Sequence, residues 1–222
     1  MNPTPKIGIF NNMDTTSSIP LTNQELAQAE WPLRIKATEA EYWALLEKAD
    51  YRADFFRGEI VATMSYESEI HSFITSRLNF FLQSLFSDFS RHRIHNSNRP
   101  VCIPACEHAI FNPDGSVIQQ PADVYEYQTV MTAELSPVLV FEVLSKTTRV
   151  RDLGEKLPCY QRISSIQHIL YVDSERMQVH HYQPYDGGQW LTTLYEAGED
   201  VIDLGVGTLS LADLYAGVEW PK

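Results

Sequence analysis

Two carboxylates and one lysine of this sequence have the types and spacing that metal-dependent phosphodiester cleavage requires. Glu142 lies inside the apolar segment VLVFEVLS (138–145), and Asp123 precedes it in the segment PADV. Lys156 follows in the segment RDLGEKLPCY. Two carboxylates at the ends of adjacent strands can hold Mg²⁺ or Mn²⁺, and a lysine ammonium can offset the charge that builds on a phosphate. The sequence therefore predicts a metal site at Asp123 and Glu142, with Lys156 beside it.

The segment around Glu142 is typical of a buried strand. Its continuous run of large apolar residues indicates a strand that is covered on both faces. Alternation along an extended strand places Val140, Glu142 and Leu144 on one face, and Phe141 and Val143 on the other. An ionised Glu at such a position loses hydration and needs a cation, a metal or several donors. A purely structural ion pair with a buried Arg or Lys is the alternative interpretation.

Asp123 is the weaker of the two carboxylates as evidence. An Asp close to a proline commonly begins a turn. The apolar and aromatic neighbours Val124, Tyr125 and Tyr127 instead favour a strand over residues 120–127 that carries Asp123.

Length and composition indicate one globular domain. The chain has 222 residues, of which 44% are hydrophobic and 21% charged, which is enough for one sizeable core. No apolar run approaches the ~20 residues that span a bilayer, and the first 20 residues lack an apolar signal core. Three cysteines at irregular spacing do not make a disulfide framework. These features predict a soluble, cytoplasmic protein without a membrane anchor.

A formal charge of −12 excludes proteins that bind nucleic acid through overall positive charge. An activity on DNA would need a local basic patch, a metal ion or a partner. Two clusters could supply positive charge, although each is equally typical of solvated surface: Lys146, Arg149, Arg151 and Lys156 near Glu142, and Arg91, His92, Arg93 and His95 upstream.

Hydrophobic periodicity and local signals place the main elements. A capping box of Thr38 and Glu41 starts a helix that runs to about Ala49. Apolar residues at three- and four-residue intervals from Ile70 to Phe89 predict a long amphipathic helix. Further elements are a hairpin over 55–64 that turns at Arg57-Gly58, strands at 99–104, 120–127, 138–144, 169–172, 177–182 and 190–196, helices at 152–163 and 211–215, and a turn at 112–115.

The order of these elements predicts an α/β domain over residues 31–222, preceded by a flexible lead-in over 1–30. The Glu142 strand, the helix after it and the strand at 169–172 form a βαβ unit, which is normally parallel and right-handed. The expected architecture is a central mixed sheet flanked by helices.

These residues together resemble the Uma-type putative restriction endonuclease family of the PD-(D/E)XK nuclease superfamily. The resemblance rests on PADV at Asp123, FEVLS at Glu142, the run from Arg149 through Lys156 to Tyr160, RGEI at Glu59, and His71 before the long helix. It implies a restriction-endonuclease-like core in which the acidic pair, Asp123 and Glu142, binds Mg²⁺ or Mn²⁺.

The position of the lysine departs from the superfamily's motif. That lysine normally stands two residues after the strand acid, where this sequence has Leu144. In the Uma-type branch the lysine has moved to the next helix, which here implies Lys156. Lys146, on the loop after the strand, is the competing candidate.

Several further residues are possible supports of the site. Glu59 is a potential third acid, His71 either faces the cleft or serves the helix as a core or capping residue, and Tyr160 could orient Lys156 or pack beside it. Cys102, Cys106 and His108 lack a second ligand pair and do not predict zinc.

The function predicted from these residues is Mg²⁺-dependent endonucleolytic cleavage of DNA. A homodimer is a candidate arrangement, because two-fold symmetry suits the cutting of both strands of a duplex. Two alternatives stay open. One is a catalytically inactive nuclease-fold module that binds protein or nucleic-acid partners, and the other is an enzyme that acts on RNA or branched DNA.

Overall fold

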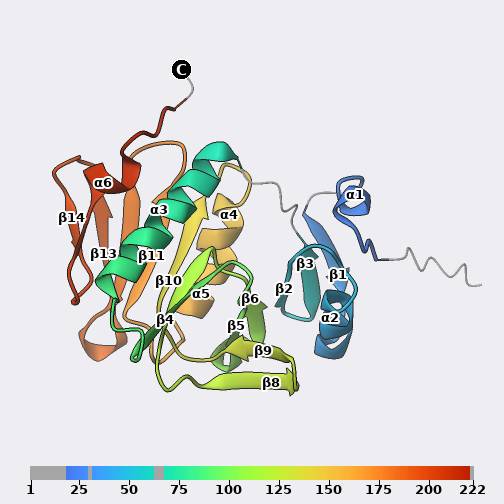
Figure 1. The fold of residues 1–222 in the computed structure, drawn as a ribbon. Helices are drawn as coiled ribbons and strands as arrows, with labels where there is room; N and C mark the ends of the chain where they lie inside the picture. The colour runs from blue at the N-terminus through green and yellow to red at the C-terminus, as the bar shows by residue number, and fades with distance from the viewer. Residues whose placement is uncertain (1–18, 30–31, 63–67, 221–222) are drawn as a thin grey trace, which may run out of the picture.

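The computed structural model describes residues 19–29, 32–62 and 68–220, which form a mixed α/β fold with two large sheets (Figure 1). One sheet has seven strands in the order β1-β3-β2-β6-β5-β9-β8. The other has six in the order β13-β12-β11-β10-β7-β4, and β14 and β15 form a separate two-stranded ribbon. The predicted α/β class with mixed sheets is confirmed.

The strands of the first sheet are β1 (Leu33–Lys36), β2 (Ala53–Phe56), β3 (Glu59–Ala62), β5 (Val101–Ile103), β6 (Ala109–Phe111), β8 (Val124–Gln128) and β9 (Met131–Glu134). Those of the second sheet and the ribbon are β4 (His92–Asn96), β7 (Gly115–Gln119), β10 (Pro137–Leu144), β11 (His168–Asp173), β12 (Val179–Pro184), β13 (Trp190–Tyr195), β14 (Val201–Asp203) and β15 (Thr208–Ser210). The helices are α1 (Asn23–Leu26), α2 (Glu39–Leu46), α3 (Glu69–Leu85), α4 (Arg149–Arg151), α5 (Leu157–Tyr160) and α6 (Leu211–Tyr215), with single 3₁₀ turns at Pro104–Cys106 and Asp186–Gly188.

Local signals in the N-terminal third act as the sequence predicts. Thr38 caps α2, and the side chain of Glu41 returns a bond to the Thr38 backbone, which completes the capping box. The β2–β3 hairpin turns through Arg57 and Gly58, both with positive φ, as a tight two-residue connection requires. Leu26 of α1 is buried, so this part of the predicted lead-in belongs to the folded domain. Residues 1–18 lie outside the described part of the chain.

The six-stranded sheet carries Glu142 and is packed on both faces. β10 and β11 run parallel, which confirms the βαβ unit. Phe141 and Val143 lie in the core that α3 covers, whereas Val140 and Leu144 lie in the core beside α5. The predicted alternation along β10 is therefore confirmed, and Glu142 points to the α5 side.

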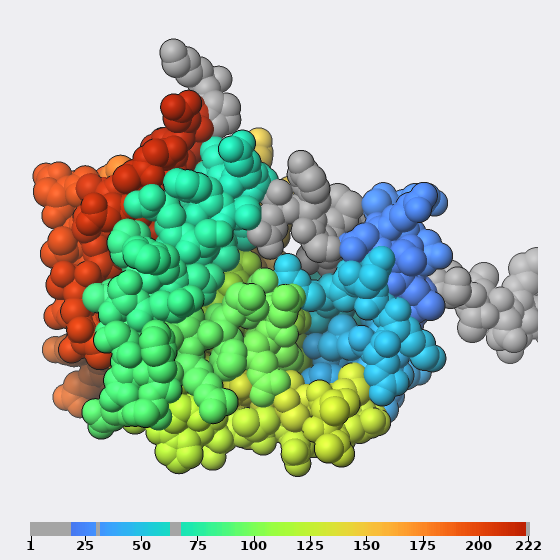
Figure 2. Space-filling view, viewed as in Figure 1, coloured from blue at the N-terminus to red at the C-terminus, as the bar shows by residue number. Residues whose placement is uncertain are grey.

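Helix α3 and the C-terminal segment meet over the first of these cores. In the space-filling view they lie next to one another on the same face of the molecule (Figure 2). The Arg77 guanidinium on α3 donates to the backbone carbonyl of Asp213 on α6. Helix α3 ends at Leu85, and both Phe73 on the helix and Phe89 beyond its end are exposed. The buried apolar stripe is therefore shorter and narrower than the one predicted from 70 to 89.

The helix after β10 contains a π-helical turn over Asp152–Lys156, between α4 and α5. The Leu157 N–H bonds to the Asp152 carbonyl five residues back. Pro158 explains this register, because proline has no N–H and its ring clashes with a carbonyl four residues earlier in an α-helix. Such wide turns occur often at functional sites, and this one carries Lys156.

Three differences from the sequence prediction bear on the site. Residues 115–119, left without an element, form β7 directly after the predicted turn. Asp123 precedes β8 rather than lying within a strand. Although the cysteines predicted no disulfide framework, Cys106 and Cys159 form one disulfide between the 3₁₀ turn and α5, and Cys102 is free.

Candidate active site

Glu142 lies in a buried cluster with two residues of the following helix. Its side chain is almost fully enclosed, and Lys156 Nζ donates to Glu142 Oε1 over 2.9 Å. The Tyr160 hydroxyl donates to the same oxygen over 2.7 Å. The π-helical turn and the short α5 thus aim an ammonium and a phenol at one carboxylate. Lys156 reaches back to Glu142, as expected of a lysine on the following helix, whereas Tyr160 contacts the acid rather than the lysine.

A second acid, Asp114, reaches the same place from β7. β7 and β10 are antiparallel with Gly115 opposite Phe141, so the register continued by one residue sets Asp114 opposite Glu142. The Val143 N–H donates to Asp114 Oδ2 over 2.7 Å, which fixes the Asp114 carboxylate against β10. Gly115 is needed here because a Cβ would lie 2.2 Å from the Phe141 ring.

His71, near the start of α3, is the partner of Asp114. His71 Nε2 lies 3.2 Å from Asp114 Oδ2, and both side chains are largely buried. The Ser68 side chain caps α3 and so places His71 in its first turn. His71 therefore reaches the cluster through Asp114 and not through Glu142.

Two more acids surround the Lys156 ammonium. Asp152 Oδ1 lies 3.4 Å from Lys156 Nζ, one helical turn earlier. Asp54 Oδ2, on β2 of the other sheet, lies 3.9 Å from Lys156 Nζ and pairs closely with Arg151. The side chains of Asp54, Asp152 and Lys156 are each no more than 7% exposed. The site therefore joins residues of both sheets around one lysine.

Charge compensation differs among these groups. Burial alone would raise the pKa of Asp114, but His71, the Val143 N–H and Lys156 hold it below its usual value. Burial raises the pKa of Glu142 to about 8; Lys156 opposes this rise, and Asp152 and Asp114 add to it. Burial alone would lower the pKa of Lys156. The nearby acids Glu142, Asp152 and Asp54 outweigh this effect and raise the pKa above its usual value, so the ammonium stays charged. Glu142 is thus the carboxyl whose neighbouring cations do not offset the effect of burial on its pKa.

The cluster fits a hard divalent cation. Asp114, directly before β7, and Glu142, opposite it on β10, offer oxygen ligands, and a cation would favour the charged form of Glu142, whose pKa burial raises. Within residues 19–29, 32–62 and 68–220, no three His, Cys, Asp or Glu side chains form a ready-made metal cage. Mg²⁺ commonly needs only one or two carboxylates, with water and substrate phosphate as its other ligands.

The comparison with protein families identifies the family of this chain. The Uma2 family, described as "Putative restriction endonuclease", matches residues 39–213. The chain belongs to the Uma2 family. Two proteins of Synechocystis sp. (strain ATCC 27184 / PCC 6803 / Kazusa), "Uncharacterized protein sll1609" and "Uncharacterized protein slr1290", are 31% and 30% identical to it. These alignments cover 70% and 82% of this chain, and 85% and 93% of the relatives.

A solved structure supports the Uma2 fold. The crystal structure of a putative nuclease belonging to DUF820, from Anabaena variabilis ATCC 29413, superposes with a TM-score of 0.60 at 17% identity. The superposition covers 89% of this chain and 98% of the other. At this identity the likeness establishes the restriction-endonuclease-like fold. In the part of the Uma2 chain that the structure describes, no helix is long and apolar enough to cross a membrane.

Other residues predicted for the Uma2 site lie away from Glu142. The prediction that Asp123 and Glu142 end adjacent strands is wrong, because the neighbours of β10 are β7 and β11. Asp123 is exposed next to β8, on the other sheet, where its N–H donates to Ser136. Lys146 is exposed on the loop after β10, whereas Lys156 contacts Glu142 directly.

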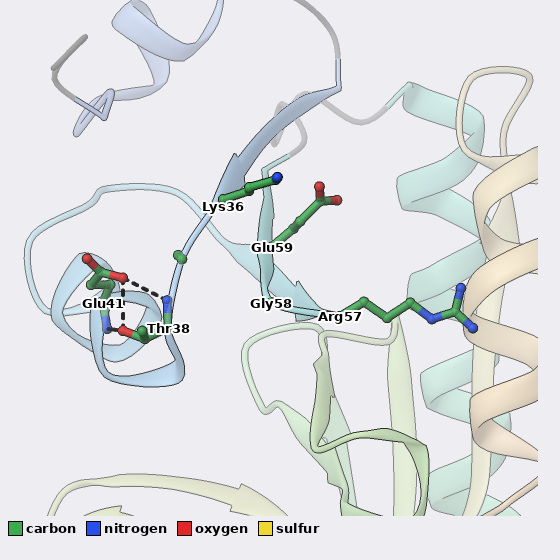
Figure 3. A pocket seen from close by; sticks show the side chains of 7 residues that line it. Lys36, Thr38, Glu41, Arg57, Gly58 and Glu59 are labelled. Atoms are coloured by element: carbon green, nitrogen blue, oxygen red, sulfur yellow. Dashed lines mark hydrogen bonds between the residues drawn. The ribbon is translucent and has the colours of Figure 1, made fainter. Parts of the chain in front are cut away.

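Glu59 bonds to Arg34, and Arg34 in turn bonds to Glu155 on the π-helical turn. Glu59 also borders a surface hollow of about 390 Å³ on β1, β3 and α2 (Figure 3). The hollow contains the Thr38–Glu41 capping box, whose side chains are already bonded to one another. We therefore assign the chemistry to the Glu142 cluster and not to this hollow.

Sequence reasoning missed Asp114 and Asp54 as members of the cluster. Asp114 lies in the segment NPDG, whose Pro, Asp and Gly indicate a turn and so concealed the strand that follows. The apolar pair Val117 and Ile118 directly after it was the signal that could have found β7. Asp54 sits in a short apolar strand, as Glu142 does, and an acid inside such a strand is the same kind of signal.

Proposed function

We propose that this chain is a metal-dependent endonuclease that hydrolyses DNA phosphodiester bonds with Mg²⁺ or Mn²⁺. The convergence of Asp114, Glu142 and Lys156 on one buried position carries the proposal, because these are the groups that hold a divalent ion and stabilise a charged phosphate. Membership of the Uma2 family supports it.

Each residue of the cluster has a role that follows from its contacts. Asp114 and Glu142 would hold the ion, which would polarise the scissile phosphate and acidify a water molecule. His71 holds Asp114, and Tyr160 holds Glu142 in its orientation. Lys156 offsets the negative charge that develops on the phosphate in the transition state.

Three of the four residues of the basic cluster predicted around Glu142 are engaged in ion pairs, and Lys146 is the exposed fourth. Arg149 pairs with Asp173 over 2.7 Å, Arg151 pairs with Asp54, and Lys156 pairs with Glu142. With a net charge of −12, the chain should bind duplex DNA weakly without metal. A divalent ion should tighten this binding, because it cancels carboxylates where a phosphate must lie.

The test compares cleavage of plasmid, linear and branched DNA and of RNA in Mg²⁺, in Ca²⁺ and in EDTA. We expect cleavage in Mg²⁺ only, and Ca²⁺-dependent binding of a fluorescent duplex at low salt. Lys156→Ala should reduce the rate by on the order of 10²-fold, whereas Lys146→Ala, the matched control, should change it little.

Each other outcome contradicts part of the proposal. A larger loss from Lys146→Ala would show that the loop lysine, and not Lys156, carries the charge. Cleavage of RNA alone, or of branched DNA alone, would support metal-dependent phosphodiester hydrolysis and contradict the proposed duplex DNA substrate. Unchanged binding with metal, and no cleavage of any substrate, would favour an inactive module that binds a partner. A homodimer stays a prediction, which light scattering with and without DNA can test.

A further inference from the structure

We propose that Asp54 is the positioning residue that joins the two halves of this active site. The inference rests on the proposed function and deepens it. Asp54 lies on β2 of the seven-stranded sheet, and its side chain is 7% exposed. Its two carboxylate oxygens contact different elements: one holds the loop that carries Asp114, and the other holds the helix that carries Lys156.

The first oxygen fixes the loop before β7. Asp54 Oδ1 accepts from the Asn112 backbone N–H over 2.7 Å and from Asn112 Nδ2 over 3.0 Å. The same amide group also donates to the Ala53 carbonyl over 2.8 Å, so Asn112 is bound to β2 at three points. Only Pro113, which is itself conformationally restricted, separates Asn112 from Asp114. The position of Asp114 across from Glu142 therefore depends on Asp54.

The second oxygen fixes the helix after β10. Asp54 Oδ2 pairs with Arg151 Nη2 and lies 3.9 Å from Lys156 Nζ. Arg151 directly precedes the π-helical turn and Lys156 is its last residue, and both point at this one carboxylate oxygen. Without the Asp54 charge, Arg151 would remain a largely buried cation close to a second buried cation, which is strongly unfavourable.

The rest of the ion-pair network shows what distinguishes the Asp54 charge. Among the described residues, the other acids within 4.0 Å of Lys156 are Glu142 and Asp152, and neither lies within ion-pair distance of Arg151. The remaining ion-pair partner of Arg151 is Glu155, at 3.5 Å, whose oxygens are also shared with Arg34. Asp54 is thus the carboxylate that contacts both cations and that also accepts hydrogen bonds from Asn112 in the loop before Asp114.

Two substitutions of Asp54 distinguish the contribution of the Asn112 contacts from that of the Arg151 and Lys156 contacts. Asp54→Asn keeps an oxygen acceptor for Asn112 and removes the charge at Arg151 and Lys156. We expect Mn²⁺ affinity, measured by calorimetry, close to that of the wild type, and a cleavage rate reduced about tenfold or more. Asp54→Ala removes both contacts, so Mn²⁺ affinity and rate should both fall. Asp50→Asn, the same chemical change at an exposed position, is the matched control.

A double variant distinguishes positioning from a merely structural role. Arg151→Gln removes the cation that Asp54→Asn leaves uncompensated, so adding it to Asp54→Asn should restore the rate several-fold. Thermal unfolding of each variant reports whether the fold is retained.

The proposal would be overturned if the two substitutions reduced the cleavage rate additively in the double variant, and if the rate of each variant fell in proportion to its thermal stability. If the wild type cleaves no substrate, the Mn²⁺ titration still decides, since an Asp54→Ala variant with wild-type affinity would refute the link to Asp114. Weaker Mn²⁺ binding in that variant, with no cleavage by the wild type, would retain Asp54 as a positioning residue and reject the nuclease activity.

Discussion

Glu142 should make the stability of the metal-free protein fall as the pH rises. Burial raises its pKa from 4.5 to about 8, against the opposing effect of Lys156. Between these values the folded chain retains a proton that the unfolded chain has lost. The free energy of unfolding therefore decreases with pH across this window, by at most about 1.4 kcal/mol per pH unit and about 5 kcal/mol in total.

The perturbation that isolates this effect is Glu142→Gln, which keeps the shape of the side chain and cannot titrate. Urea unfolding in EDTA between pH 5 and pH 8, followed by circular dichroism, should give a steeper decline for the wild type than for the variant. Only the difference between the two slopes is diagnostic, because the variant also removes a partner of Lys156 and shifts stability at every pH. Glu155→Gln, on the π-helical turn that carries Lys156 and 27% exposed, should keep the wild-type slope.

Equal slopes in the wild type and Glu142→Gln would refute this reasoning. Glu142 would then be ionised throughout the range and would form an ordinary structural ion pair with Lys156, the alternative that the sequence left open. Mg²⁺ or Mn²⁺ should flatten the wild-type slope, because the ion favours the charged carboxylate.

The disulfide and Gly115 give two further predictions. The Cys106→Ala/Cys159→Ala double variant should lose about 4 kcal/mol of stability relative to the oxidised wild type, from the 53-residue separation of the two cysteines, and excess dithiothreitol should abolish most of that difference in urea unfolding. Gly115→Ala should cost about 1–3 kcal/mol and weaken Mn²⁺ binding, because its Cβ would meet the buried Phe141 ring. Gly154→Ala, where a Cβ meets nothing within 4 Å, is the control; a larger loss there than at Gly115 would contradict the packing argument.

The sequence predicts much of the fold because its strongest signals are local. The capping box at Thr38, the Arg57–Gly58 turn and the apolar run around Glu142 each specify their element without reference to the rest of the chain. β7 was missed because a turn signal directly precedes it. The division of strands between two sheets depends on pairings far apart in sequence, which alternation and propensity do not encode.

Only the part of the site that lies within one βαβ unit was predictable from the sequence. Glu142, Lys156 and Tyr160 follow one another within a single βαβ unit, so their spacing implies that they converge. Asp114 and Asp54 reach the cluster through an antiparallel pairing and through contact between the sheets, respectively. Asp123 is a carboxylate with apolar neighbours in the sequence, as expected of a metal ligand on a buried strand. The strand that follows it, β8, pairs with β9 in the seven-stranded sheet and not with β10.

The identity of the metal-binding acid is the most direct test of the central claim. Calorimetric titration with Mn²⁺ should detect one site in the wild type and in Asp123→Asn, and no comparable binding in Asp114→Asn or Glu142→Gln. Each exchange replaces a carboxyl group with an amide of nearly the same volume, so Asp123→Asn is matched to Asp114→Asn. Binding that survives Asp114→Asn, or that Asp123→Asn abolishes, would contradict the account.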